Sequence, residues 1–379
     1  MRLKLGMVGG GEGAFIGGVH RIASRLDDRY ELVAGALSSD ASRAISSARA
    51  LGIADERAYT DFEEMARAER ARPDGIDVVA IVTPNYMHFP VARAFLEAGI
   101  HVICDKPVTT SLDDALALKE LVKTSGAYFA LTHNYTGYPM VRQARDLVHQ
   151  GKVGKIRVVQ AEYVQDWLAD KAEDTDNKQA RWRTDPKQSG PAGCLGDIGT
   201  HAFNLAQFIA GSRATEVAAD LTTFVPGRRL DDNVHVMLRF DDGARGMLWS
   251  SQVAPGNENA LSVRIYGDKG GLEWHQETPN ELWFTPLGEP TQRLTRGGPG
   301  STETANRGTR IPPGHPEGYL EGFATLYSNI ADAIQARQGG NTPEAALVPG
   351  IDDGIEGMRW VEAVIRSSEN NSAWEKLQS

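Results

Sequence analysis

The sequence predicts an α/β protein with two domains: a doubly wound parallel sheet at the N-terminus, followed by an α+β domain with a largely antiparallel open sheet. Three observations support this class. An apolar run over residues 3–8 leads directly into a glycine-rich loop over 9–17. Short apolar runs then alternate with helical segments, and beyond about residue 135 strand-like segments follow one another with short turns. We therefore expect one domain over residues 1–132 and a second over 133–379, closed by C-terminal helices.

The elements of the first domain follow from this alternation. The strands expected from apolar runs cover residues 3–8, 30–37, 78–82, 101–104 and 128–131. The helices expected between them cover residues 18–25, 41–51, 61–70, 87–98 and 112–124. Gly52, Gly99 and Gly126 follow three of these helices, as helix-ending glycines do. The continuous apolar run at 78–82 is typical of a parallel strand that is buried on both faces.

The second domain is predicted to be rich in strands. The expected strands cover residues 156–164, 215–223, 234–240, 244–252, 262–267 and 272–275. Hairpin signals at 240–243 and 267–271 join some of them into an open antiparallel sheet. Helices are expected at 139–150, 195–210, 319–335 and 351–367. A polar, tryptophan-rich stretch at 166–190 and a Gly-, Pro- and Thr-rich stretch at 286–316 interrupt the sheet.

Composition narrows the class of protein. The 379 residues are 41% hydrophobic, enough for two domains with sizeable cores. The formal net charge of −10, with no long basic run, argues against a nucleic-acid partner. No apolar run approaches a membrane span, and the first one is too short for a signal peptide, so we expect no membrane partner. Two cysteines, Cys104 and Cys194, without a C-x-x-C pair predict a reducing, cytoplasmic setting.

The glycine-rich loop predicts a dinucleotide pyrophosphate site. Gly9 and Gly11 match the first two glycines of G-x-G-x-x-G, and Ala14 takes the third position. Gly17 follows three residues later, so the loop is longer than usual. Backbone N–H groups at a helix start attract an anion, and glycine allows its close approach. The alternative is a tight strand–helix turn without a ligand.

Two further segments carry candidate chemistry. Lys106 precedes Pro107 at the carboxyl end of a predicted strand, which is the ligand edge of a parallel sheet. The alternative is a surface lysine in a loop. Asp197 and His201 lie four apart in the predicted helix 195–210, so the carboxylate can orient the imidazole. The alternative is an exposed pair. No second cluster has metal-ligand spacing, and we expect no metal.

Together the glycine loop, Thr83-Pro84-Asn85 with His88, Lys106-Pro107 and the run from Gly193 through Asp197 to His201 resemble the glucose–fructose oxidoreductase, inositol dehydrogenase and rhizopine catabolism (Gfo/Idh/MocA) family. The resemblance implies a Rossmann domain that binds NAD or NADP and a second domain that binds substrate. It also implies oxidation of a secondary hydroxyl of a sugar or cyclitol. The C-terminal sheet often forms oligomer contacts in this family, so we expect a homo-oligomer, a dimer or tetramer.

The resemblance also implies roles for individual residues. Lys106 matches the lysine that hydrogen-bonds the reacting hydroxyl, and His201, paired with Asp197, matches the general base. The catalytic residues are then Lys106, Asp197 and His201. The coenzyme residues are Gly9, Gly11, Gly13, Ala14, Phe15, Ile16, Ser38, Ser39, Arg43, Thr83, Asn85, His88, Asp105 and Lys106. The substrate residues are Lys106, Tyr135, Tyr163, Trp167, Arg183, Asp197, His201 and His315.

The chain departs from the family pattern at three places. Asp105 stands where a glutamate is common, and the glycine loop carries extra residues. The segment after the second strand lacks the acid that usually holds the ribose 2′-hydroxyl of NAD. Asp40 could bind a ribose hydroxyl, whereas Arg43 could bind a 2′-phosphate, and we favour NAD over NADP.

The residues of the stretch 166–190 favour a pyranoside substrate because sugar C–H faces stack on aromatic rings. We therefore expect a sugar or glycoside dehydrogenase that acts by hydride transfer. One candidate for the oxidised carbon is C3 of a pyranose, as in levoglucosan or glucoside-3-dehydrogenases. An inositol dehydrogenase is the alternative enzyme. A non-catalytic dinucleotide-sensing regulatory protein is the alternative of another class.

Overall fold

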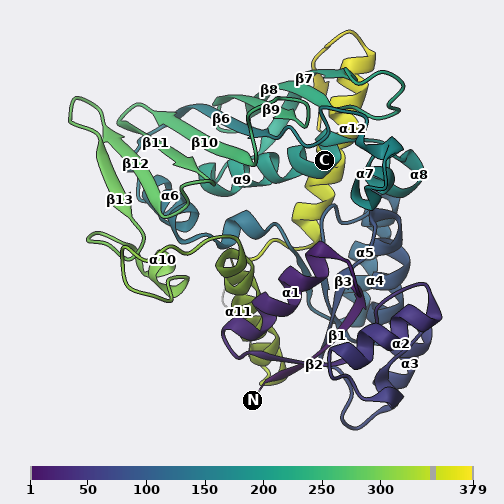
Figure 1. The fold of residues 1–379 in the computed structure, drawn as a ribbon. Coiled ribbons are helices and arrows are strands. Elements are labelled where there is room, and N and C mark those ends of the chain that lie inside the picture. Colours follow the sequence, from purple (N-terminus) through teal and green to yellow (C-terminus); the bar gives the residue numbers. More distant parts are fainter. Residues whose placement is uncertain (1, 342–346, 378–379) are drawn as a thin grey trace. The chain divides into compact units, whose positions relative to one another are not determined.

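Residues 2–341 and 347–377 are described by a computed structural model, in which the chain forms two structural units (Figure 1). The first unit comprises the described residues of 1–137 and 319–355. The second unit comprises those of 138–318 and 356–379, so the division falls inside the last long helix. Among the described residues, no helix combines the length and apolar character needed to cross a membrane.

The first unit contains a five-stranded sheet with the order β2-β1-β3-β4-β5, and every neighbouring pair is parallel. The strands are β1 (Leu3–Gly9), β2 (Tyr30–Ala36), β3 (Val78–Val82), β4 (His101–Cys104) and β5 (Phe129–Leu131). All five residues of β3 are buried, as the continuous apolar run predicts for a central parallel strand. The predicted doubly wound parallel sheet is confirmed.

Helices alternate with these strands as predicted. They are α1 (Phe15–Leu26), α2 (Ala41–Ala50), α3 (Phe62–Ala71), α4 (His88–Glu97) and α5 (Leu112–Ser125). Short 3-10 helices in this unit are η1 (Asp55–Arg57), η2 (Asn85–Met87) and η3 (Asn134–Gly137). Asp40, Asp61 and Ser111 accept backbone N–H groups at the starts of α2, α3 and α5, which satisfies donors that a helix leaves open.

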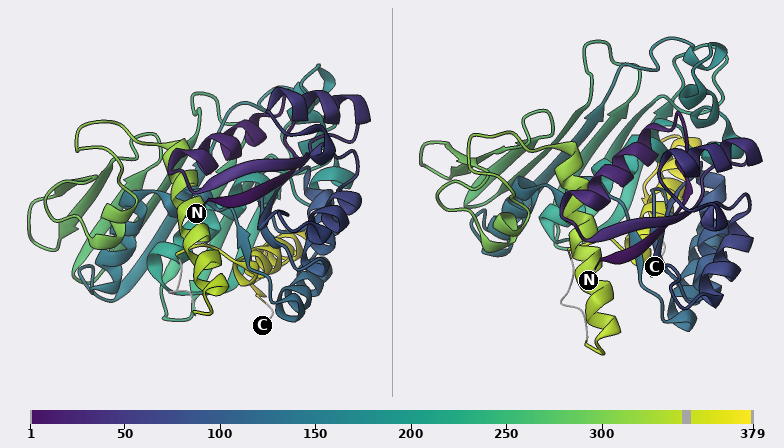
Figure 2. Two further views of the ribbon diagram at one scale, coloured as in Figure 1. Left: turned by 90° about the horizontal axis from the view of Figure 1, so that it is seen from below. Right: turned by 60° about the horizontal axis from the view of Figure 1, so that its bottom comes forward.

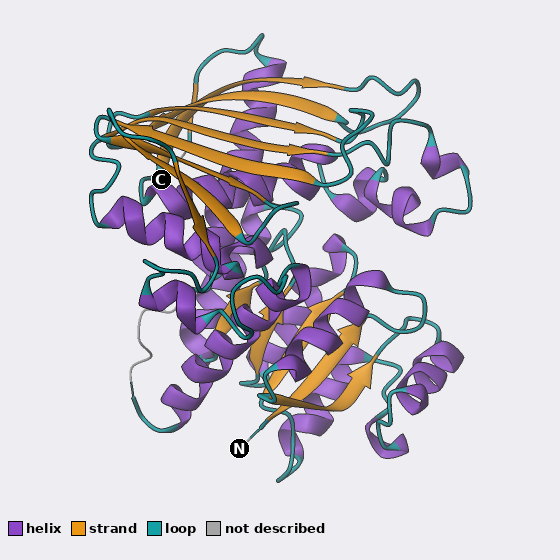
Figure 3. Cartoon of the chain, turned by 60° about the vertical axis from the view of Figure 1, so that its left-hand side comes forward, coloured by secondary structure: helices purple, strands orange, loops and turns teal. Residues whose placement is uncertain are grey.

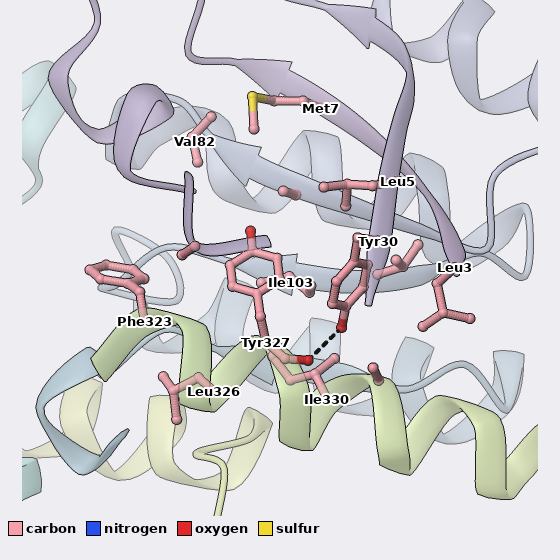
Figure 4. Packing of buried hydrophobic residues seen from close by; sticks show 14 of the residues in the cluster. Leu3, Leu5, Met7, Tyr30, Val82, Ile103, Phe323, Leu326, Tyr327 and Ile330 are labelled. Carbon is pink, nitrogen blue, oxygen red and sulfur yellow. Dashed lines mark hydrogen bonds between the residues drawn. The ribbon is translucent and has the colours of Figure 1, made fainter. Parts of the chain in front are cut away.

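Helix α11 (Tyr319–Gln338) belongs to the first unit, although the sequence predicts a single boundary at residues 132–133. Its apolar face carries Phe323, Tyr327 and Ile330 into the cluster formed by the sheet (Figure 4). Tyr30 donates a hydrogen bond of 2.7 Å to the carbonyl oxygen of Tyr327. Figures 1 and 2 show α11 alongside α1. The grouping differs from the predicted boundary because burial of this face joins segments that are far apart in the sequence.

The second unit contains a nine-stranded sheet with the order β13-β12-β11-β10-β6-β9-β8-β7-β14. All neighbouring pairs are antiparallel except β6 and β9. The strands are β6 (Ile156–Val164), β7 (Ala214–Thr222), β8 (Asn233–Phe240), β9 (Arg245–Ser251), β10 (Ala260–Gly267), β11 (Gly270–His275), β12 (Glu281–Pro286), β13 (Gln292–Thr295) and β14 (Glu375–Lys376). The largely antiparallel sheet is confirmed. The last three strands were not predicted, and β13 lies inside the stretch 286–316, where its exposed residues give no apolar signal.

Helices cover one face of this sheet (Figure 3). They include α6 (Pro139–His149), α9 (Thr200–Ala210) and α12 (Ile351–Glu369). Phe203 of α9 stacks on Trp360 of α12, with ring centroids 4.6 Å apart. The remaining helical segments are η4 (Ala172–Asp174), α7 (Lys178–Arg183), α8 (Pro186–Ser189), η5 (Leu195–Gly199) and α10 (Glu303–Arg307). Met237 and Met247 project from β8 and β9 and are 51% and 56% exposed. The homo-oligomer predicted through this sheet stays a prediction.

Candidate active site

The glycine loop joins β1 to α1 in a form that suits a pyrophosphate. Gly9, Gly10 and Gly13 have φ values of +78°, +71° and +78°, which L side chains rarely adopt. A Cβ atom on Gly13 would meet nothing within 4 Å, so this part of the loop is open. The first turn of α1 has no acidic residue, and its N-cap, Ala14, makes no side-chain capping hydrogen bond. Backbone N–H groups with the positive end of the helix dipole therefore fit an anionic group here.

The structure corrects the role predicted for Ala14 within the glycine fingerprint. Close packing of the first helix on the first strand is the function of the third glycine. Gly17 performs it, because a Cβ atom there would overlap the Cα atom and carbonyl oxygen of Gly10. Gly10 itself packs against Val82, because a Cβ atom on Gly10 would lie only 2.6 Å from the Val82 Cγ2 atom. Ala14 lies one position before the helix as its N-cap, and coenzyme contact by Ala14 stays a prediction.

The segment after β2 uses Asp40 to begin α2. Its Oδ1 atom accepts hydrogen bonds of 2.8 Å from the Arg43 backbone N–H and from the Ser42 hydroxyl. The backbone bond from Arg43 is the main reason that the pKa of Asp40 is lowered, with the Ser42 bond second. Ser38 Oγ accepts from the Asp40 backbone at 3.1 Å, while Ser39 and Arg43 are exposed. Coenzyme contact by Ser38, Ser39, Phe15, Ile16 and Arg43 stays a prediction.

His88 holds two loops at the ligand edge of the parallel sheet. Its Nδ1 atom lies 2.7 Å from the carbonyl oxygen of Pro107, and its Nε2 atom lies 3.1 Å from that of Thr83. Burial lowers the pKa of His88, so the neutral ring is favoured. The Lys106–Pro107 peptide bond is cis. His88 was predicted to contact coenzyme, but the structure shows it fully buried between the loops that carry Thr83 and Lys106.

Asp105 lies in a buried polar chain that the sequence did not reveal. Its Oδ1 atom accepts from the Thr132 hydroxyl and lies 3.3 Å from His20 Nε2. His20 Nδ1 lies 2.7 Å from the Tyr327 hydroxyl oxygen. Burial alone would raise the pKa of Asp105, but His20 and the Thr132 hydrogen bond together lower it. Residues from α1, α11 and the end of β5 therefore fix the residue that precedes Lys106.

The predicted helix 195–210 is confirmed from residue 200 onward, but its first turn is wider. Leu195–Gly199 (η5) is a π-helical turn, and Thr200 begins α9. Asp197 lies in the π turn and His201 in the first turn of α9. Such turns occur often at functional sites.

Buried Asp231 fixes the entry to this turn. Its Oδ1 atom accepts from Gly193 N at 2.6 Å, and its Oδ2 atom accepts from Leu195 N at 2.8 Å. The Cys194 thiol donates to Oδ2 at 3.2 Å. Burial raises the pKa of Asp231, despite these donors. The sequence offered no signal for Asp231 because it follows the turn by more than thirty residues.

Asp197 is bound by neighbours within the second unit. Gln252 Nε2 donates to Asp197 Oδ2 at 2.9 Å, and Arg183 Nε lies 3.3 Å from the same oxygen. The rings of Tyr163 and His201 have centroids 6.2 Å apart. The structure therefore places Arg183 and Gln252 against Asp197, and Tyr163 beside His201, which follows Asp197 by four residues.

The remaining predicted substrate residues have different surroundings. Trp167 lies beside Arg183, with 5.9 Å between the guanidinium carbon and the ring centroid. Tyr135, in the first unit, is buried, with its ring centroid 6.3 Å from that of Tyr319. His315 is exposed in a loop of the second unit, and its carbonyl oxygen accepts a hydrogen bond of 2.5 Å from buried Arg296. Within residues 2–341 and 347–377, no group of His, Cys, Asp and Glu is placed to hold a metal ion.

The parallel sheet, its glycine loop and the Lys106-Pro107 turn define a dinucleotide-dependent oxidoreductase. Residues 3–135 match the oxidoreductase family with an NAD-binding Rossmann fold, and residues 141–273 match the GFO/IDH/MocA C-terminal domain. The chain belongs to the Gfo/Idh/MocA family of oxidoreductases, and it carries that family's NAD-binding domain.

Known relatives agree with this assignment. An oxidoreductase structure from Sinorhizobium meliloti is 55% identical, with a TM-score of 0.90 and 99% of each chain covered. A structure of an inositol dehydrogenase homologue with NAD+ from Azotobacter vinelandii is 35% identical, with a TM-score of 0.96, and 99% of this chain and 97% of that chain are covered. Levoglucosan dehydrogenase from Pseudarthrobacter phenanthrenivorans is 30% identical over 74% of this chain and 75% of its own length.

Proposed function

We propose that the protein oxidises a secondary hydroxyl of a sugar or glycoside with NAD as the hydride acceptor. The observation that carries the proposal is the Asp197 and His201 pair on a turn held by buried Asp231, in a chain with an open glycine loop for a dinucleotide. A sensor of the same fold would not require an acid and an imidazole four residues apart at such a turn. The family resemblance assigns Lys106, Asp197 and His201 to one reaction.

Each of these residues has a defined task in the proposed reaction. His201 Nδ1 is buried, and we assign Nε2 as the atom that takes the proton of the substrate hydroxyl. The charge of Asp197, four residues before His201, stabilises the imidazolium that results. The Lys106 ammonium stabilises negative charge on the substrate oxygen as the carbonyl forms. When bound, the nicotinamide supplies the acceptor for the hydride.

The glycine loop and the α1 N-terminus would hold the pyrophosphate. We favour NAD over NADP, supported by the NAD+ bound in the inositol dehydrogenase homologue. Asp40 now contributes less to this preference than the sequence suggested, because its Oδ1 atom caps α2. Comparison of the two coenzymes in one assay tests the preference.

A cyclic polyol is the substrate class that the relatives and the aromatic side chains support. Two relatives are named after levoglucosan and inositol, and both compounds are rings with several hydroxyl groups. Trp167, which is partly exposed beside Arg183, offers aromatic surface near Asp197, which favours a pyranoside with a C–H face. The 35% identity to the inositol dehydrogenase homologue keeps a cyclitol as the second candidate.

A substrate panel tests the proposal. Purified protein is incubated with NAD or NADP and with pyranoses, glycosides, levoglucosan or inositols, and reduced nicotinamide is followed by its absorbance. Turnover of at least one pyranose derivative is expected. Tight binding of the dinucleotide without turnover of any compound would favour the sensor, whereas turnover of inositols alone would favour the cyclitol enzyme.

A further inference from the structure

Arg183 approaches a catalytic carboxylate from the stretch 166–190. It ends α7, and its Nε atom lies 3.3 Å from Asp197 Oδ2. The side chains of Arg183 and Asp197 are only 24% and 16% exposed. At this distance and burial, a guanidinium favours the ionised form of a carboxylate.

The position of Arg183 is set by its own helix. Its Nη1 atom donates to Gln179 Oε1 at 2.6 Å, and Gln179 Oε1 also accepts from Trp182 Nε1 at 3.2 Å. The guanidinium carbon lies 4.2 Å from the centroid of the Trp182 ring, which adds a cation–π contact. Because these contacts limit the rotamers of Arg183, little side-chain entropy remains to be lost in holding Asp197.

Gln252 binds the same carboxylate oxygen from the sheet. It follows β9, and its amide nitrogen donates to Asp197 Oδ2 at 2.9 Å and to Gln165 Oε1 at 3.4 Å. Gln165 Oε1 also accepts from Trp167 Nε1 at 3.1 Å. Since Trp167 lies beside Arg183, the contacts close into a ring around Asp197.

We propose that Arg183 and Gln252 are positioning residues that hold the Asp197 carboxylate in place for its task with His201, and that the Arg183 cation offsets part of the Asp197 charge that His201 experiences. The inference rests on the proposed function, and it gives Arg183 a different role from the substrate contact predicted for it. An ionised Asp197 stabilises the imidazolium, the Gln252 hydrogen bond to Oδ2 restricts how the carboxylate turns, and the nearby Arg183 guanidinium attracts the same oxygen. The stretch 166–190 thereby sets the basicity of the catalytic imidazole.

In the second unit, His201 lies beside Tyr163 from β6 and four residues after Asp197 from η5, and it is affected through Asp197 by Arg183 from α7; buried Asp231 holds the entry to the same turn. Loss of the Arg183 charge removes a cation from this group. The proton affinity of His201 must then rise, because fewer positive charges oppose its protonation.

The test measures the titration of His201 by NMR in the full-length protein without substrate, with the resonance assigned from His201→Asn. Arg183→Gln is expected to raise the midpoint by about one pH unit. Arg183→Lys, which keeps the charge, should stay near the wild-type midpoint. Arg181→Gln is the matched control, since Arg181 lies on the same helix but pairs with exposed Asp176. An unchanged midpoint in Arg183→Gln would overturn the inference.

Kinetics separate this inference from the proposed function. With a substrate that the wild type oxidises, Arg183→Gln should lower kcat about tenfold to a hundredfold, leave KM within about threefold, and move the acid limb of kcat/KM upward. A large rise in KM, with kcat and the acid limb of kcat/KM unchanged, would mean that Arg183 contacts substrate and would overturn the positioning role. If the wild type oxidises no polyol while the His201 midpoint still moves, the proposed function fails and the inference about Asp197 stands.

Discussion

Replacement of Gly17 by alanine is expected to disturb the dinucleotide loop, whereas the same replacement at Gly18 is expected to be harmless. Both glycines lie in α1 and neither has a positive φ. A Cβ atom on Gly17 would overlap backbone atoms of Gly10, which cannot rotate away as a side chain can. The nearest atom to a Cβ on Gly18 is Arg21 Nη2 at 3.9 Å, an ordinary contact.

The expected magnitudes follow from these contacts. Alanine for glycine inside a helix stabilises by about 1 kcal/mol, and this gain applies to both positions. Forcing a methyl group into a packed site costs about 1–3 kcal/mol, and here the upper part of that range applies because the obstacle is backbone. Gly18→Ala should therefore gain about 1 kcal/mol, and Gly17→Ala should lose about 2 kcal/mol. For a unit of this size the two melting temperatures should differ by about 6–12 °C.

Thermal unfolding and NAD titration by calorimetry measure both consequences. Gly17→Ala should bind NAD at least about tenfold more weakly, because the loop must move to admit the methyl group. Gly18→Ala should bind it as the wild type does. If Gly17→Ala matches Gly18→Ala in both stability and NAD affinity, the backbone of Gly10 does not exclude a methyl group at position 17.

Two further predictions concern buried ionisable groups. Asp231→Asn should destabilise the protein by about 1–3 kcal/mol in urea unfolding at neutral pH. The carboxylate accepts from Gly193 N through one oxygen and from Leu195 N through the other, whereas an amide has only one oxygen. Unchanged stability would contradict this role. Burial, followed by the Lys106 charge, lowers the pKa of His133 from 6.5 to about 3, so its neutral form contributes stability that is present above pH 6.5 and is lost as the pH falls through about 3. His133→Asn should therefore show a flatter fall of unfolding free energy between neutral pH and about pH 4, and a parallel fall in both proteins would count against it.

Local patterns sufficed to predict the fold class. The apolar run over Val78–Val82 is a buried central strand, and Ile156–Val164 has the bounds expected of it. Both are decided by neighbouring residues in the sequence. The membership of α11 in the first unit could not be predicted in this way, because it depends on contacts between Tyr327 and Tyr30 across most of the chain.

The candidate site shows the same contrast. Lys106, Asp197 and His201 stand out in the sequence by their order and spacing. Asp231 and Gln252 do not, because an acid and an amide after a strand are common and only the folded chain brings them to the π turn and to Asp197. The π turn itself was predicted as an ordinary helix, since its residues have no distinct local signal.

The most direct test of His201 as the general base compares the wild type with His201→Asn, using a polyol that the wild type oxidises. Reduced nicotinamide is followed under steady-state conditions, and NAD binding is measured separately. We expect kcat to fall by about two to four orders of magnitude while NAD affinity stays within about threefold, because the general base is lost and the dinucleotide loop is intact. A variant that turns over at nearly the wild-type rate would contradict the assignment of His201 as the base and, with it, the proposed chemistry.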